Sequence, residues 1–173
     1  MTLLGRPAAD EAAAYYFKYF DLVPKDARLV LAEQQHALEA LRSILPERAS
    51  YRYAEDKWSI REVIGHLIDC ERLFVFRAFW FARGFDSPLP SFDQEKAATS
   101  AGAQSRDWEG LVAELVALRA STVSFFNALP DDAWDRRGVA SGAECSVRAL
   151  AYLAAGHVTH HLHELREKYG WSG

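Results

Sequence analysis

Three histidines stand at positions from which they could bind one metal ion. His157 and His161 are four residues apart, so on a helix they share one face, and that face is also an apolar stripe. His66 lies in a second apolar helical pattern, between Val63 and Leu67. A lone buried imidazole usually forms a hydrogen bond within the core. Three imidazoles converging from two helices would instead be the ligand set of a catalytic zinc or nickel site with an open position.

The heights of these histidines along their helices favour a shared site. At a rise of about 1.5 Å per residue, His66 lies about 9 Å from the start of its helix at Ile60. By the same rise, His161 and His157 lie about 10 and 16 Å from the end of theirs at Lys168. Antiparallel packing of the two helices would bring all three rings to one level. Parallel packing would separate His66 from the pair by roughly 10 Å.

Other polar residues near these helices have competing explanations. His160 could support the metal ligands, although it also fits a surface position. Asp69 and Glu62 share a helix face with the first histidine and could orient its ring, but Glu62 also fits a helix cap and Asp69 an edge ion pair. Arg119 could bind an anionic substrate or, more simply, balance a buried carboxylate. We identify no general base.

Two further observations narrow the chemistry. The sequence H-V-T-H-H has the spacing of the helical zinc-protease motif, but Val158 stands where that motif has its glutamate base, so such a peptidase is disfavoured. His36 and His163 are expected to be solvated. The chain has no glycine-rich phosphate loop, and the serine of the GVASG segment (138–142) is one place off a nucleophile elbow, which removes support for nucleotide binding and for a serine hydrolase.

Four long helices are expected to carry these residues, because apolar residues recur every three or four positions and no run of five or six residues alternates as a strand would. We therefore predict an all-α protein. Ser59 and Glu62 predict a capping box at the start of the second helix, and Leu31, Leu38 and Leu45 are predicted to face inward on the first. The four helices are expected at about 26 or 28 to 45, 60–83, 106 or 107 to 129, and 146–168.

Two connecting segments are also informative. Residues 11–22 could form a short helix whose aromatic side chains cover the bundle. Residues 85–105 predict irregular chain that is too long for a tight hairpin. About 21 extended residues reach about 70 Å, whereas the preceding helix is about 36 Å long, so this crossover could return along the whole bundle and help to cover the site. The second and third helices would then be parallel neighbours.

Composition indicates one soluble domain spanning residues 1–173, with an aromatic lead at 1–25. Half of the 173 residues are hydrophobic and 25% are charged. The net charge of −4 does not favour nucleic acid binding, and the densest apolar stretch, 73–82, is interrupted by Arg77 and is too short to cross a membrane. With only Cys70 and Cys145 and no export signal, we expect a reduced, cytoplasmic protein.

The segments W-S-I-R-E-V-I-G-H-L-I-D-C-E-R (58–72) and A-G-H-V-T-H-H (155–161) resemble the DinB-like superfamily of metalloenzymes, and the resemblance extends over nearly the whole chain. It implies a four-helix bundle with up-down-down-up topology and a long crossover between the second and third helices. It also implies metal ligands at His66, His157 and His161. At Val158 the family usually has a polar or acidic residue, so a mechanism that needs a base there is weakened.

The resemblance also implies a range of activities. Members with assigned activities include S-transferases that use bacillithiol or mycothiol, a mycothiol-dependent maleylpyruvate isomerase, and proposed metal-dependent hydrolases, while many other members have none. A divalent ion held by three neutral imidazoles shifts a bound thiol or water toward its anion. We therefore expect a zinc- or nickel-dependent enzyme acting on electrophilic small molecules, foremost a low-molecular-weight-thiol S-transferase and otherwise a hydrolase.

A non-enzymatic alternative remains open at the level of sequence. The chain could be a metal-binding or stress-response module that acts through dimerisation, in which case its site would be closed to a fourth ligand or would not take metal. Phe76, Phe79, Trp80 and Phe81 present more apolar surface than one helix face can bury. A homodimer is therefore expected, although a thicker core would equally account for these side chains.

Overall fold

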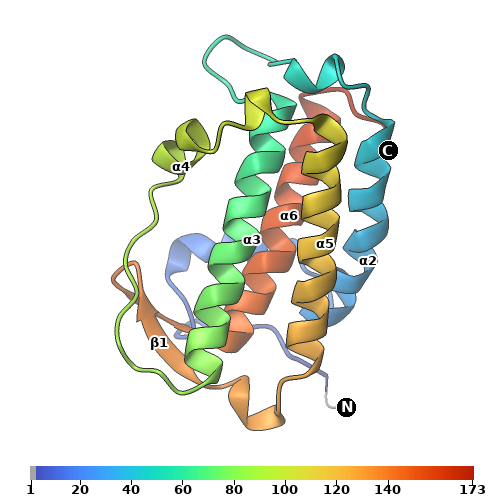
Figure 1. Ribbon diagram of the computed structural model, residues 1–173. Coiled ribbons are helices and arrows are strands. Elements are labelled where there is room, and N and C mark those ends of the chain that lie inside the picture. The colour runs from blue at the N-terminus through green and yellow to red at the C-terminus, as the bar shows by residue number, and fades with distance from the viewer. Residues whose placement is uncertain (1–2) are drawn as a thin grey trace.

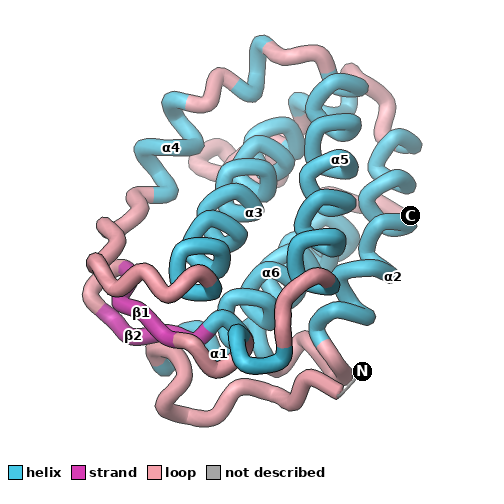
Figure 2. Tube along the Cα trace, turned by 60° about the horizontal axis from the view of Figure 1, so that its bottom comes forward, coloured by secondary structure: helices cyan, strands magenta, loops and turns pink. Residues whose placement is uncertain are grey.

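Four long helices form a bundle in the computed structural model, which describes residues 3–173 (Figure 1). Two short helices and a two-stranded hairpin surround the bundle, and short 3₁₀ turns lie between the helices (Figure 2). The helical bundle expected from the sequence is therefore confirmed. The helices are α1 (Phe17–Phe20), α2 (Ala27–Ala40), α3 (Ile60–Ala82), α4 (Gln94–Ser100), α5 (Trp108–Asn127) and α6 (Val147–Glu167), and the strands are β1 (Arg137–Ala140) and β2 (Ala143–Ser146).

Hydrogen bonds near the helix ends show how the helices that carry the histidines run. The Tyr169 hydroxyl, just beyond α6, donates to the Trp58 carbonyl, just before α3, at 2.6 Å. The start of α3 therefore lies beside the end of α6, which is the antiparallel arrangement that the histidine heights require. At the same end of the bundle, Arg61 Nη1 donates to the Arg106 carbonyl at 2.7 Å, so α3 and α5 begin side by side.

The helix starts follow the sequence signals. Ser59 Oγ accepts from the Glu62 amide at 3.2 Å, and Glu62 Oε2 accepts from the Ser59 amide at 2.7 Å, so the capping box is present. Ser146 caps α6 by accepting from the Ala149 amide at 2.9 Å. These caps fix where α3 and α6 begin, and with them the heights of the histidines.

The first long helix ends earlier than predicted. It stops at Ala40 and is followed by a 3₁₀ turn, Leu41–Ser43, rather than continuing to residue 45. Leu31 and Leu38 are fully buried, but Leu45 is 62% exposed, so its predicted inward position is wrong. The residue before a proline is pushed away from helical geometry, and here the extended Ile44 is buried in place of Leu45.

The expectation of a purely helical protein is wrong for residues 137–146. Strands β1 and β2 pair antiparallel, and Ser141 and Gly142 close the hairpin with φ of +56° and +77°. This is the left-handed conformation that two-residue hairpin turns favour. Each strand has only four residues, too few for a visible alternation, so the S-G pair was the one available signal.

The crossover between α3 and α5 is more ordered than predicted. It runs along the bundle from the end of α3 to the start of α5, as Figures 1 and 2 show. It contains α4, which Asp93 caps by accepting from the amides of Glu95 and Lys96 at 3.1 and 3.0 Å. Leu89 donates to the Val139 carbonyl at 2.9 Å, so the hairpin anchors the crossover.

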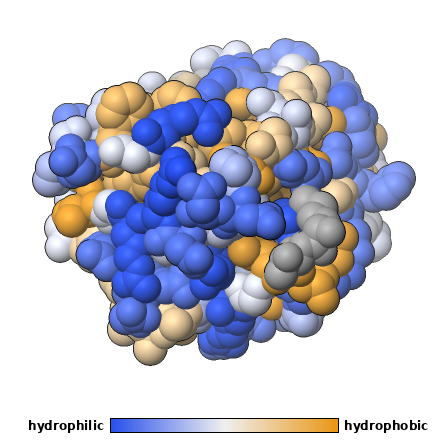
Figure 3. Space-filling view, turned by 90° about the horizontal axis from the view of Figure 1, so that it is seen from below, coloured by the Kyte–Doolittle hydropathy of each residue, from blue (hydrophilic) through white to orange (hydrophobic). Residues whose placement is uncertain are grey.

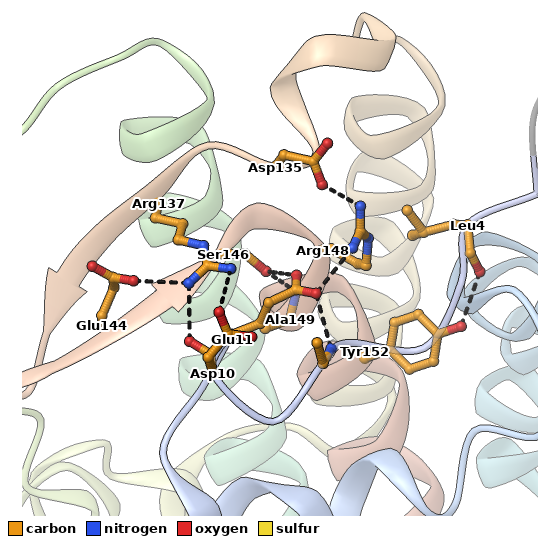
Figure 4. Close-up of polar contacts among 11 residues, drawn as sticks. Leu4, Asp10, Glu11, Asp135, Arg137, Glu144, Ser146, Arg148, Ala149 and Tyr152 are labelled. Atoms are coloured by element: carbon orange, nitrogen blue, oxygen red, sulfur yellow. Dashed lines mark hydrogen bonds and ion pairs between the residues drawn. The ribbon is translucent and has the colours of Figure 1, made fainter.

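The N-terminal aromatic segment is held against the start of α6. In place of one predicted helix at 11–22, it forms a 3₁₀ turn (Ala14–Tyr16) followed by α1. Just before these, Glu11 accepts from Ser146 Oγ at 2.6 Å and from Arg148 Nη1 at 2.9 Å, and Figure 4 shows its carboxylate among these donors. This anchor brings the aromatic residues that follow it onto the face of α6.

The outer surface carries few large apolar groups. Phe76 and Phe79 are 47% and 39% exposed, whereas Phe81 is buried and Trp80 stacks on Phe85 at 4.3 Å between ring centroids. The end of the bundle viewed in Figure 3 is mostly polar, with apolar groups gathered near its margins. None of the helices within residues 3–173 is both long and apolar enough to span a membrane. The homodimer stays a prediction.

Candidate metal centre

The structure brings His66, His157 and His161 together inside the bundle. His157 Nε2 lies 3.0 Å from His66 Nε2 and 3.2 Å from His161 Nε2. The three side chains come from α3 and α6, and their residues are 3%, 6% and 8% exposed. One nitrogen from each ring lies within 4.8 Å of the other two, so a single ion could contact all three.

The spacing of these nitrogens fits a metal better than it fits hydrogen bonding within the cluster. A neutral imidazole nitrogen carries either one proton or one lone pair, so His157 Nε2 can form only one of its two close contacts as a hydrogen bond. Ligands held at ~2.0–2.1 Å from a tetrahedral zinc lie about 3.3 Å from one another. The observed 3.0 and 3.2 Å are close to that spacing.

Burial keeps the cluster in the neutral form that binds metals. Burial, together with the neighbouring His161, lowers the pKa of His66 to about 3. The pKa of His157 is also well below its ordinary value, first through burial and then through the charges of His161 and His66. At neutral pH these two imidazoles therefore present unprotonated nitrogens.

Aromatic rings enclose the cluster. Trp58 lies 4.7 Å from the His66 ring, and Tyr19 and Phe74 each lie 5.5 Å from the His157 ring, measured between centroids. The Tyr19 contact shows that the N-terminal aromatic segment, which was predicted to cover the bundle, also packs against the histidine cluster. These walls restrict the directions from which a ligand can reach the histidines.

Cys70 lies close to the cluster without the character of a metal ligand. Its Sγ is 3.7 Å from both ring nitrogens of His66. Burial raises the pKa of this thiol to about 12, so it is protonated at neutral pH. The sulfur packs beside the ligand ring as a small apolar group.

Glu164 is a site residue that the sequence reasoning missed. Its Oε2 lies 3.0 Å from His161 Nδ1, at ion-pair distance but outside the alignment of a hydrogen bond, and its Oε1 lies 2.5 Å from Lys168 Nζ. The approach of His161, opposed by burial and assisted by Lys168, lowers the pKa of Glu164 to about 2. A carboxylate behind a ligand histidine orients the ring. The i, i+3 spacing between His161 and Glu164 was the sequence signal that could have identified this residue.

The other residues proposed to support the ligands are placed differently. His160 is half-buried, with Nε2 3.5 Å from Glu164 Oε2, so it joins the outer edge of the site rather than the triad. Glu62 serves the helix cap and pairs with Arg52 at 2.7 Å, and Asp69 lies 4.0 Å from Arg72. Within residues 3–173 neither carboxylate contacts a histidine of the triad, so the proposed orienting role does not hold for them. His36 and His163 are exposed, as expected.

Arg119 balances a buried carboxylate, which was the simpler of its two explanations. It is fully buried, and its Nη2 lies 2.8 Å from Glu71 Oε2. Its Nη1 donates to the side-chain oxygen of Gln34. Neither Glu71 nor Gln34 was identified from the sequence, because each lies within an otherwise unremarkable helical pattern. The three side chains form a buried charge cluster, which we call the arginine cluster.

Two openings flank the histidines. A cavity of about 450 Å³ reaches His157, and a cleft of about 260 Å³ reaches His161 and Glu164. Gln94, at the start of α4, lines both. The crossover therefore passes over the site between the two openings, where the sequence analysis expected it.

Comparison with known proteins agrees with this architecture. The family model described as "DinB superfamily" matches residues 30–165. Among solved structures, the chain is similar to YfiT from Bacillus subtilis, with a TM-score of 0.71 and 19% sequence identity over 97% of this chain and 95% of that chain. That protein is described as "a probable metal-dependent hydrolase with an unusual four-helix bundle topology". No curated protein matches the sequence. The structural similarity, at this level of identity, concerns the fold.

Proposed function

We propose that this chain, which belongs to the DinB superfamily, is a divalent-metal-dependent enzyme whose metal ligands are His66, His157 and His161. The observation that carries the proposal is the convergence of three buried imidazole nitrogens, two of whose contacts are 3.0 and 3.2 Å. The same proposal includes an up-down-down-up order of α2, α3, α5 and α6. It is supported by the crossover, which returns along the bundle so that α3 and α5 begin at the same end.

The surroundings of the triad favour an open, reactive site over a closed structural one. A divalent ion held by three neutral imidazoles keeps its charge and would lower the pKa of a water or thiol that reaches its free position. The cavity at His157 and the cleft at His161 provide access for such a molecule and for a substrate. The aromatic rings of Tyr19 and Phe74 line the cavity and that of Trp58 lines the cleft, so each approach to the triad has an apolar wall.

Transfer of a low-molecular-weight thiol to an electrophilic small molecule is the activity that we favour. The residues of the structure that line the 450 Å³ cavity include no aspartate or glutamate, so a nucleophile bound there finds no carboxylate base. A thiol starts from a pKa near 8.5, far below that of water at about 15.7, and so it needs the least help in losing its proton. The volume beside His157 leaves room for an electrophile next to the thiol.

Hydrolysis is the second candidate, and Glu164 is the observation that favours it. Its carboxylate lines the other opening and lies 3.0 Å from His161, where it could accept a proton from an attacking water. YfiT, whose fold this chain shares, is described as a probable metal-dependent hydrolase. The two candidates use the same triad and differ in the nucleophile.

Metal content tests the site itself. Tag-free protein should contain about one divalent ion per chain by mass spectrometry, and His66→Ala and His157→Ala should lose it while helicity by circular dichroism persists. The control is His163→Ala, which removes an exposed histidine from the same helix and should retain the ion. No bound metal after incubation with zinc or nickel would contradict the proposal and favour a non-enzymatic helical module.

Turnover tests the nucleophile. The metal-loaded protein should consume electrophiles such as a chlorodinitrobenzene or an epoxide only when a thiol is added, and a panel of esters and amides only slowly or not at all. Hydrolysis of the panel without thiol, lost in His157→Ala, would favour the second candidate instead.

A further inference from the structure

Arg77 is a buried arginine without a carboxylate partner. It lies on α3 and is 3% exposed. Its Nη2 donates to the Pro90 carbonyl at 3.0 Å and to Ser141 Oγ at 2.8 Å, both neutral acceptors. Its Nε is buried and has no hydrogen-bond partner. Within residues 3–173 no acidic side chain lies at ion-pair distance from this guanidinium.

The contrast with Arg119 shows what Arg77 lacks. Arg119 is equally buried, but Glu71 neutralises it at 2.8 Å. Burying a cation without a counter-charge is strongly unfavourable, because the guanidinium loses its hydration and gains only dipoles in return. An anion supplied from outside the chain would give Arg77 the counter-charge that Glu71 gives Arg119.

Arg77 faces the same cavity as His157. Both line the 450 Å³ opening, together with Lys18 from the N-terminal segment. The described lining of this cavity contains these cationic and imidazole groups with no aspartate or glutamate, although the chain as a whole has a net charge of −4. The cavity is thus a locally positive region of an acidic protein, which attracts anionic small molecules.

The helix geometry sets the distance between this charge and the metal ligands. Arg77 is eleven residues after His66, close to three full turns, so the two residues lie on one face of α3, about 16 Å apart along its axis. Cys70 and Phe74 lie between them on this face and also line the cavity. Side chains on a helix lean toward its N-terminus, which for Arg77 is the direction of His66.

We infer that the cavity binds a small molecule carrying an oxyanion, a carboxylate or a phosphate, with that group at Arg77 and the rest of the molecule extending toward His157. The anion accepts from the guanidinium of Arg77, whose bonds within the protein go only to neutral acceptors, and Lys18 adds positive charge. The inference deepens the proposed function by naming an acidic substrate class. The binding of the anion at Arg77 does not depend on a metal.

Calorimetric titration of matched probes tests this site. Hexanoate, hexyl phosphate and the neutral hexanamide are titrated into the purified protein before and after removal of metal. The wild-type protein should bind at least one of the anions about tenfold or more tightly than the amide, and the anion with the larger preference identifies the oxyanion. Arg77→Met should remove this preference and leave hexanamide binding unchanged. The control is Arg83→Met, which removes an exposed arginine beyond the end of the same helix and should behave as wild type.

A second variant keeps the test valid if Arg77→Met does not fold. Leu73 is half-buried and lines the cavity, so Leu73→Trp should fill it and abolish the anion preference while Arg77 stays in place. Equal affinity for anions and amide in the wild type would overturn the inference. A folded Arg77→Met protein that keeps the preference for anions would also overturn it. If Arg77→Met does not fold, a Leu73→Trp protein that keeps the preference would do the same. Because the titration is repeated on metal-free protein, a chain that binds the anion but no metal would refute the proposed function and leave the Arg77 site standing.

Discussion

The arginine cluster and the histidine cluster are both buried in the bundle, but they differ in how their polar groups are paired. In the arginine cluster the charge of Arg119 is met by Glu71 at 2.8 Å and by the side chain of Gln34. In the histidine cluster three imidazole nitrogens converge on one another, and His157 Nε2 cannot satisfy both of its close neighbours. In the arginine cluster the chain itself supplies the counter-charge, whereas in the histidine cluster the ring nitrogens are arranged to bind a group from outside the chain.

The arginine cluster also helps to position the histidine cluster. Arg119 Nη2 donates to the Ala154 carbonyl at 3.3 Å, and Gln34 Nε2 donates to the Ala155 carbonyl at 2.8 Å. Both carbonyls belong to the turn of α6 that directly precedes His157. We conclude that internal charge pairing braces the helix and leaves its next turn free to present ligands.

The largest effect is expected from breaking the arginine cluster. Arg119→Met should lower the free energy of unfolding by about 3–5 kcal/mol, because it leaves the Glu71 carboxylate buried without its partner. Denaturant titration followed by circular dichroism measures this loss. The double variant Glu71→Leu/Arg119→Met removes both charges and should recover most of the stability. A single-variant loss below about 1 kcal/mol would show that Glu71 is neutral or hydrated in the protein, and the contrast between the clusters would fail.

The next largest effect is expected from supplying the missing group to the histidine cluster. Zinc at a hundred times its dissociation constant should stabilise the protein by about 2.7 kcal/mol, since it binds the folded state only. Thermal unfolding with and without zinc measures this gain. His157→Ala should lose the gain and His163→Ala should keep it. A zinc effect of equal size in all three proteins would place the metal elsewhere.

A smaller effect is expected from Glu164, which supports the triad from behind. Glu164→Gln should weaken zinc affinity about 10- to 100-fold, because the side chain would no longer hold the His161 ring by charge. Competition with a chromogenic chelator gives the affinity. Glu167→Gln removes an exposed carboxylate from the same helix and serves as the matched control. Unchanged affinity in Glu164→Gln would mean that its charge serves Lys168 alone.

The smallest effect is expected at the cap of α3, the helix that carries both His66 and Glu71. Ser59→Ala should cost about 1 kcal/mol at neutral pH, because the Glu62 amide loses its acceptor. The measurement is again denaturant unfolding. A cost as large as that of Arg119→Met would show that the cap, rather than the arginine cluster, holds the helix in register.

The same cap should depend on pH in a defined direction. Burial raises the pKa of Glu62, but hydrogen bonds from Ser59 and Arg52 outweigh this effect. The pKa of Glu62 in the folded protein therefore lies below its ordinary value of 4.5. A depressed pKa contributes stability that is fully present above 4.5 and is lost as the pH falls through the lower, folded value. The Ser59 hydroxyl also donates to Glu62 Oε2 at 2.9 Å, so this part of the Ser59→Ala cost should be lost as the pH falls below 4.5. A cost that stays constant down to pH 3 would contradict a contribution from that hydrogen bond.

Periodicity and spacing were enough to predict the helices and the metal candidates. The capping box at Ser59 is a local signal between residues three positions apart and was predicted correctly, and the last helix begins where its pattern predicted, with Ser146 as its N-cap. The i, i+4 spacing of His157 and His161 places them on one helix face in any fold that keeps the helix. The same reasoning placed His66 at the level of the pair, subject to antiparallel packing.

The sequence-based predictions were wrong or incomplete where a local pattern is short, or where a residue's partner is far away along the chain. The hairpin has four residues per strand, too few to show alternation, and Ile44 rather than Leu45 reaches the core because of the bend before Pro46. Glu71 and Gln34 are indistinguishable in sequence from solvated helix residues. Their roles come from Arg119, which is 48 and 85 residues away along the chain.

Local sequence patterns were therefore sufficient to predict the four long helices, the starts of α3 and α6 and the helix faces that the histidines occupy, because these properties depend on neighbours within a few residues. Which buried groups meet could not be predicted in this way. Glu71 reaches Arg119 and supplies its counter-charge, whereas Arg77 faces an opening and has no carboxylate at ion-pair distance among the described residues. That pairing depends on the packing of whole helices, since the energy of a buried charge is set by atoms within a few ångströms in space, whatever their separation in sequence.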